Sequence, residues 1–162
     1  MRITKLVLAF FLLLCITSNA QGWEYVASTH FDRLDGATTE LKAFQNPFNG
    51  LVRIQLEQSG GRVQGVHRRS MVLSKKEAES FVGMGFVLLS GDSGNTPTIT
   101  AATKYGETLV YGKVFSEHEG SYLTLAIHST ANPRDGVGTP IGFGEHDYSN
   151  LRAFLQTLER NL

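Results

Sequence analysis

The sequence predicts an α+β, β-rich protein in which two antiparallel sheet-plus-helix halves share one core. The first observation is a period-two alternation, clearest where Val52, Ile54 and Leu56 are interleaved with polar residues. The second is that each set of strand-like segments is followed by an apolar stripe at helical spacing. Because neither sheet would bury its apolar face well alone, we expect both to contribute to the same core.

The N-terminus predicts export. Arg2 and Lys5 precede an uncharged apolar run from Leu6 to Ile16, and small residues follow at Ser18 and Ala20. This order is typical of a secretory signal peptide, which we expect to be cleaved after Ala20. The apolar run is shorter than the roughly 20 residues that a spanning helix needs. We therefore expect a periplasmic or secreted protein with no transmembrane segment in its mature chain.

Composition limits the mature chain to one domain at 21–162, with halves at about 21–91 and 92–162. Cys15 is the single cysteine, so the mature chain contains none and must rely on its core instead of on disulfides. Removal of Arg2 and Lys5 leaves 13 basic residues against 15 acidic ones, a net charge of −2. This balance predicts no binding to nucleic acid.

The first half is expected to contain four strands and a helix. The strand segments are 23–31, 38–44, a third beginning at Val52, and 63–72. Ser74 and Glu77 have the spacing of a capping box, which begins a predicted helix at 75–90. Gly83 and Gly85 weaken that helix, so a shorter helix followed by a buried strand is the alternative.

The second half repeats this order after a connector near Gly91–Asn95. Its strand segments are 98–103, 108–117, 121–129 and an edge strand at 140–144 that contains a proline. Asp147 is expected to cap the final helix. The apolar stripe of that helix is Tyr148, Leu151, Phe154, Leu155 and Leu158.

Short motifs in the chain resemble a family of small exported bacterial proteins. The motif residues are Leu73, Ser74, Glu77, Ala78 and Phe81, then Thr98, Ile99, Thr100, Thr103 and Gly106, then Gly112 and Phe115. The similarity covers roughly residues 50 to 160. It implies two strand-plus-helix halves, a helix continuing to Ser90 and a place in the bacterial envelope. It implies no catalytic residue.

Two groups of residues are candidate binding surfaces. A basic cluster near the first helix is a candidate anion-binding patch, helped by the dipole of the helix N-terminus. An aromatic face on the second-half hairpin is a candidate ligand or protein contact. The basic cluster is Arg62, His67, Arg68, Arg69, Lys75 and Lys76, and the aromatic face is Tyr111, Tyr122 and His128.

Two motifs that suggest catalysis or metal binding are explained more simply by structural roles. Gly91–Gly94 matches the tetrapeptide around a protease nucleophile, but no matching histidine segment precedes it, so we interpret it as a connector. Glu145, His146 and Asp147 are adjacent, and on a strand adjacent residues supply at most two ligands. We therefore predict no catalytic residue, no metal site and no cofactor.

The sequence thus favours a non-enzymatic binding or accessory protein of the cell envelope, whose partner is an envelope or extracellular protein or a glycan. One alternative is a small extracytoplasmic hydrolase that uses His128 or His146 with Glu145 or Asp147. Another is a subunit that adds an edge strand to a larger assembly.

Overall fold

A computed structural model describes residues 22–32, 36–61, 65–90, 99–102, 107–116, 120–129 and 141–162. The predicted signal peptide at 1–20 and the connector at 91–95 lie outside these ranges, and both remain predictions. Within the described ranges, no helix is long and apolar enough to cross a membrane.

The described residues form two four-stranded antiparallel sheets and two α-helices, which confirms an α+β fold. The first sheet is made of β1 (Glu24–Asp32), β2 (Ala37–Gln45), β3 (Val52–Gly60) and β4 (Val66–Leu73), in that order. The second is made of β5 (Ile99–Ala102), β6 (Glu107–Ser116), β7 (Gly120–Ser129) and β8 (Ile141–Gly144). Helix α2 (Lys75–Ser90) follows the first sheet; a short 3₁₀ turn, η2 (Glu145–Asp147), and helix α3 (Tyr148–Arg160) follow the second.

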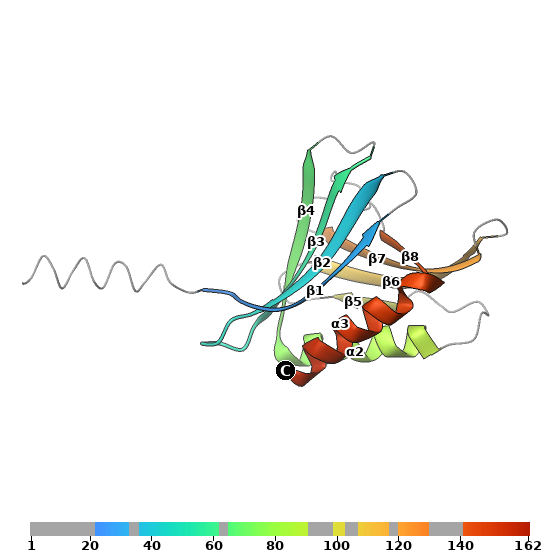
Figure 1. The fold of residues 1–162 in the computed structure, drawn as a ribbon. Coiled ribbons are helices and arrows are strands. Elements are labelled where there is room, and N and C mark those ends of the chain that lie inside the picture. The colour runs from blue at the N-terminus through green and yellow to red at the C-terminus, as the bar shows by residue number, and fades with distance from the viewer. Residues whose placement is uncertain are drawn as a thin grey trace, which may run out of the picture.

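Each helix packs onto the half of the chain to which it does not belong. Helix α3, at the end of the chain, lies against β1 of the first sheet and against α2 (Figure 1). Helix α2 contacts β5 and β6 of the second sheet as well as β4. The expectation that each helix covers its own sheet therefore holds only in part, because α3 packs mainly across the boundary between the halves.

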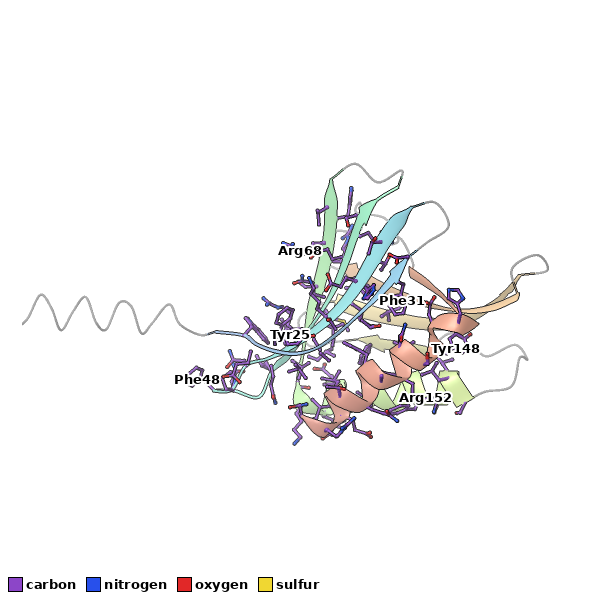
Figure 2. The ribbon with its side chains drawn as sticks, viewed as in Figure 1. Tyr25, Phe31, Phe48, Arg68, Tyr148 and Arg152 are labelled. Atoms are coloured by element: carbon purple, nitrogen blue, oxygen red, sulfur yellow. The ribbon has the colours of Figure 1, made fainter. Side chains whose placement is uncertain are left out.

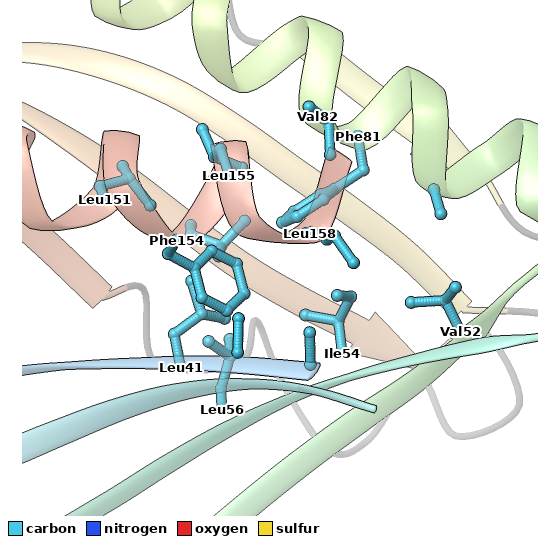
Figure 3. Close-up of a cluster of buried hydrophobic side chains, with 14 of the residues drawn as sticks. Leu41, Val52, Ile54, Leu56, Phe81, Val82, Leu151, Phe154, Leu155 and Leu158 are labelled. Atoms are coloured by element: carbon cyan, nitrogen blue, oxygen red, sulfur yellow. The ribbon is translucent and has the colours of Figure 1, made fainter. Parts of the chain in front are cut away.

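The apolar side chains meet in a layer between the first sheet and the two helices. Figure 3 shows Leu41 and Ile54 facing Phe154 and Leu158, with Phe81 of α2 beside them. Leu125 and Ile127 of β7 belong to the same buried cluster. The stripe predicted for α3 is buried at Leu151, Phe154, Leu155 and Leu158.

The first sheet is buried on one face only. In β3, Val52, Ile54 and Leu56 are buried, while Arg53, Gln55 and Glu57 between them are half-buried. The same alternation continues through β2. Because successive side chains point to opposite faces of a strand, the sheet has a core face and a second face that is open to solvent.

The two helix starts differ. The capping box of α2 is confirmed: the Ser74 backbone N–H donates to Glu77 Oε2 at 2.7 Å, and the Glu77 N–H donates to Ser74 Oγ at 3.4 Å. Asp147 occupies the N-cap position of α3, but its side chain makes no capping hydrogen bond, so that expectation was wrong. Asp147 has helical backbone angles because the 3₁₀ turn leads directly into α3.

Helix α2 runs unbroken from Lys75 to Ser90, so the alternative of a short helix followed by a strand is wrong. Gly85 lies in the buried stripe with Phe81, Val82, Leu88 and Leu89. Tertiary burial of this stripe outweighs the low helix propensity of the two glycines.

We predict that Gly83→Ala stabilises the protein by about 0.5–1 kcal/mol. Gly83 is exposed in the helix interior, and a Cβ added there would meet no atom within 4 Å. The gain comes from lower backbone entropy in the unfolded chain, and urea unfolding followed by circular dichroism would measure it.

Gly60→Ala is the matched control. Gly60 has a φ of +76°, and an added Cβ would lie 3.0 Å from the Gly36 carbonyl oxygen. We expect this substitution to destabilise the protein. Equal effects at the two glycines would contradict the conformational explanation.

Candidate binding site on the open face of the first sheet

Strand register arranges the open face of the first sheet in four rows that cross all its strands. The first row is Tyr25, Phe44, Arg53 and Val72; the second is Ser28, Lys42, Gln55 and Ser70; the third is His30, Glu40, Glu57 and Arg68; the fourth is Asp32, Thr38, Ser59 and Val66. The face therefore has aromatic rings and Arg53 in its first row, hydroxyl, ammonium and amide groups in its second, and mostly ionisable groups in its third. This gradient separates apolar contact from polar contact along the strands.

The first row, together with Trp23, forms an aromatic–arginine cluster, defined here as Trp23, Tyr25, Phe44 and Arg53. The guanidinium carbon of Arg53 lies 4.9 Å from the ring centre of Trp23 and 4.6 Å from that of Phe44. The rings of Tyr25 and Phe44 meet edge to face, with centres 6.2 Å apart. Cation–π attraction and edge-to-face packing hold the four side chains together.

Arg53 is not neutralised by the residues around it. Its Nε is buried and has no hydrogen-bond acceptor. Within the part of the chain that the structure describes, its recorded contacts are the two aromatic rings. A ligand cannot reach this buried Nε, but the Nη groups of Arg53 are not buried and keep their donors available to an incoming acceptor.

A tightly bonded turn presents a further aromatic ring at the same end of the sheet. In the β2–β3 turn, the Asn46 backbone N–H donates to the Leu51 carbonyl at 2.8 Å, and the Phe48 N–H donates to Asn46 Oδ1 at 2.9 Å. Phe48 is nevertheless 78% exposed. Figure 2 shows Phe48 and Tyr25 at this end of the sheet, with Arg68 toward the other. A single exposed apolar side chain is ordinary, but Phe48 and the exposed Tyr25 both lie at this end of the sheet, and grouped apolar side chains are a feature of contact surfaces.

The charges of the third row are largely satisfied by one another. Glu57 Oε2 accepts from Arg68 Nε at 2.9 Å and from Gln55 at 3.3 Å, and Lys42 Nζ lies 3.8 Å away. The hydrogen bond from Arg68, followed by the positive charge of Lys42, lowers the pKa of Glu57. Lys42 also contacts Glu40 at 2.8 Å, and this hydrogen bond is the main reason that the Lys42 pKa is raised.

A groove of about 400 Å³ runs beside the cluster, between the edge strand β1 and helix α3. Its lining residues are Tyr25, Val26, Ala27, Ser28, Thr29, His30, Asn150, Ala153, Phe154 and Thr157. None of them is Asp, Glu, Lys or Arg. Tyr25 belongs to both the groove and the aromatic–arginine cluster, so the two form one continuous surface.

The predicted basic cluster does not form one patch among its described members. Arg68 lies on the open face opposite Glu57, whereas Arg69 pairs with Leu56 and His67 with Gln58, positions on the other face. Lys75 and Lys76 begin α2, beyond the far end of β4, and both are exposed. Arg62 lies outside the described residues. Strand alternation separates residues that the sequence places side by side.

The predicted aromatic face of the second sheet is described only by its backbone register. Tyr111 is paired with Leu125, Tyr122 with Val114 and Gly144, and His128 with Thr108. The side chains of these three residues lie outside the described part of the structure.

The candidate hydrolase residues offer one described contact. His146 Nε2 lies 3.2 Å from Asp147 Oδ2, but the His146 side chain is 79% exposed. The Asp147 side chain is 13% exposed, so only one member of the pair is withdrawn from water and the imidazole lies at the surface. The side chains of His128 and Glu145 lie outside the described residues. Among the residues whose side chains are described, no three His, Cys, Asp or Glu side chains form a metal-binding group.

The aromatic–arginine cluster was not identified from the sequence. Trp23 precedes β1, Phe44 lies in β2 and Arg53 in β3, so these residues are brought together only when the strands pair. The sequence does show that Arg53 lies on the solvent-facing side of the third strand, because it alternates with core residues. That alternation, combined with the aromatic residues in and before the two preceding strands, would have indicated the aromatic–arginine cluster.

Comparisons with known proteins give little help. No family model and no curated protein matches the chain. Among solved structures, one titled as the plant transcriptional regulator PBF-2 is similar over 83% of this chain and 79% of that chain, with 11% sequence identity and a TM-score of 0.44. A similarity of this degree does not support transfer of function.

We predict that Glu57→Gln lowers the free energy of unfolding at neutral pH by about 0.5–1 kcal/mol. The folded pKa of Glu57 lies below its ordinary value of 4.5, so its contribution is fully present above that value and is lost as pH falls through the folded pKa. Urea unfolding between pH 7 and pH 2 should show the wild type and the variant converging at low pH. A difference that stays constant across this range would contradict the assignment.

Proposed function

We propose that this protein is an exported, non-enzymatic binding module of the cell envelope, and that the open face of its first sheet is the binding surface. The observation that carries the proposal is the aromatic–arginine cluster, in which Arg53 is stacked on two rings and has no acceptor at Nε. Side chains that serve stability alone are normally buried or paired, whereas these combine exposed aromatic area with an unsatisfied donor.

The surroundings of the cluster support binding rather than catalysis. Tyr25 is 61% exposed and Phe48 is 78% exposed, so broad aromatic area faces solvent at one end of the sheet. The adjoining groove adds uncharged lining along β1 and α3. Aromatic area beside a few well-placed polar groups is a common composition for a ligand contact.

A tagged form of the protein, incubated with its own envelope fraction, tests this proposal. We expect it to recover a partner protein or glycan, and we expect the double substitution Tyr25→Ala with Phe48→Ala to reduce recovery by about tenfold, since exposed aromatic anchors dominate such contacts. Mass spectrometry and carbohydrate analysis of the recovered material provide the measurement.

Val87→Ser is the matched control, because Val87 is 60% exposed on helix α2 and lies outside the proposed surface. This variant should recover the partner as well as the wild type does. Equal loss in the control and the double variant would contradict the placement of the surface. No recovery with the wild type would contradict the binding function.

Strand addition at β1 is a second candidate. β1 is an edge of the first sheet, and its residues from Tyr25 to His30 include no Asp, Glu, Lys or Arg. The groove beside this strand gives room for an added segment. An unpaired, uncharged edge is a template for another strand.

We also infer that the two halves share one core and unfold together. Support comes from the buried cluster, which includes Leu125 and Ile127 of β7 together with residues of the first sheet and of both helices. The packing of α3 on β1 ties the end of the chain to its beginning.

Leu125→Ala tests that inference. Leu125 is fully buried, so we expect a loss of about 2–5 kcal/mol in the free energy of unfolding. Trp23 is the single tryptophan and lies next to the first sheet. Its fluorescence should therefore show the same shift in urea midpoint as circular dichroism. An unchanged Trp23 midpoint would mean that the halves unfold separately.

A further inference from the structure

We propose that the aromatic–arginine cluster binds a carboxylated sugar ring of an acidic polysaccharide. Arg53 donates to the carboxylate, and the exposed rings support the sugar. The proposal rests on the proposed function, because it names the ligand class for the same face.

The state of Arg53 points to an anionic group. A guanidinium offers only donors. Here Nε is buried, whereas the Nη groups are not buried and have no acceptor among the described residues, so they are the donors that a ligand can reach. The rings of Trp23 and Phe44 hold it in place at 4.9 Å and 4.6 Å. A fixed, planar fork of this kind matches the two oxygens of a carboxylate. Arg68, in contrast, already donates to Glu57 at 2.9 Å.

The neighbouring rows fit a sugar ring. A pyranose has an apolar C–H face and a rim of hydroxyl groups, so it needs aromatic surface next to hydrogen-bonding groups. Tyr25 supplies exposed aromatic surface, and its hydroxyl lies 2.8 Å from Ser28 Oγ. The second row continues with hydroxyl, ammonium and amide groups at Ser28, Lys42 and Gln55. Apolar and polar contacts thus lie side by side on one face.

The same surface disfavours the other anionic polymers. A nucleic acid carries closely spaced phosphates, and Glu40 and Glu57 lie in the third row of the face. The whole chain has 15 basic and 15 acidic residues, which gives no general attraction for any polyanion, so an acidic polymer must be held by local contacts. Acidic peptides are typically recognised by clustered arginines. On this face Lys42 and Arg68 already contact Glu40 and Glu57, which leaves Arg53, among the described residues of the face, as the cation without an acidic partner.

Titration of the purified protein with sodium alginate, followed by Trp23 fluorescence, tests the proposal. We expect saturable binding to alginate and none to dextran, a neutral polysaccharide. Arg53→Gln should weaken alginate binding by about tenfold or more, since a charge-assisted hydrogen bond to the carboxylate is lost. Arg53→Lys should also weaken binding, because lysine lacks the planar fork.

Arg68→Gln is the matched control and should change the affinity by less than about twofold, because Arg68 is exposed and already paired. If Arg53→Gln does not fold, as judged by circular dichroism, Tyr25→Ala replaces it, because the Tyr25 ring is 61% exposed and its loss spares the core. Equal weakening by Arg53→Gln and Arg68→Gln would overturn the proposal, because it would indicate diffuse attraction.

Two further outcomes would also overturn the ligand assignment. Tighter binding to single-stranded oligothymidylate than to alginate would reassign the site to nucleic acid. If the protein does not bind alginate but still recovers a partner from the envelope fraction in a manner that depends on Tyr25 and Phe48, the acidic sugar is rejected. The proposed binding function is then retained. Failure of that recovery as well would reject both.

Discussion

The arrangement of this protein depends on the packing of its last helix against its first sheet. Helix α3 buries Leu151, Phe154, Leu155 and Leu158, and it lies against β1 and α2. Both described helices lie on the same side of this sheet, which gives it a core face and an open face (Figure 1). A contact between the two ends of the chain therefore determines which side chains of the first sheet are available to a ligand.

Much of the fold was predictable because it is determined by short-range patterns in the sequence. Period-two alternation located the strands of both sheets, and the Ser74–Glu77 capping box located the start of α2. The predicted bounds of that helix were correct in spite of Gly83 and Gly85. The packing of α3 onto the first sheet was not predictable, because an amphipathic stripe indicates that a helix is covered and does not indicate by what.

The candidate site was not predictable for a related reason. The sequence drew attention to Arg68, Arg69, Lys75 and Lys76, which are close in the chain. Register places Arg68 opposite Glu57 and Arg69 on the other face, so proximity in sequence did not produce a patch. Arg53 is flanked by apolar residues in its strand, and its aromatic neighbours come from other strands. Sites on sheet faces depend on cross-strand pairs, which a single segment does not reveal.

The contrast between the two ends of the open face explains why a selective contact is favoured over a general electrostatic one. At the charged end, Glu57 accepts from Arg68 and Gln55 and lies near Lys42, so those charges are already satisfied and contribute little to an incoming ion. At the aromatic end, Arg53 has no acidic partner among the described residues, and its Nη groups are not buried. A ligand gains most where it binds these groups and covers the exposed Tyr25 ring at once. Selectivity therefore arises because a ligand must present a flat ring and an acidic group together at this one position.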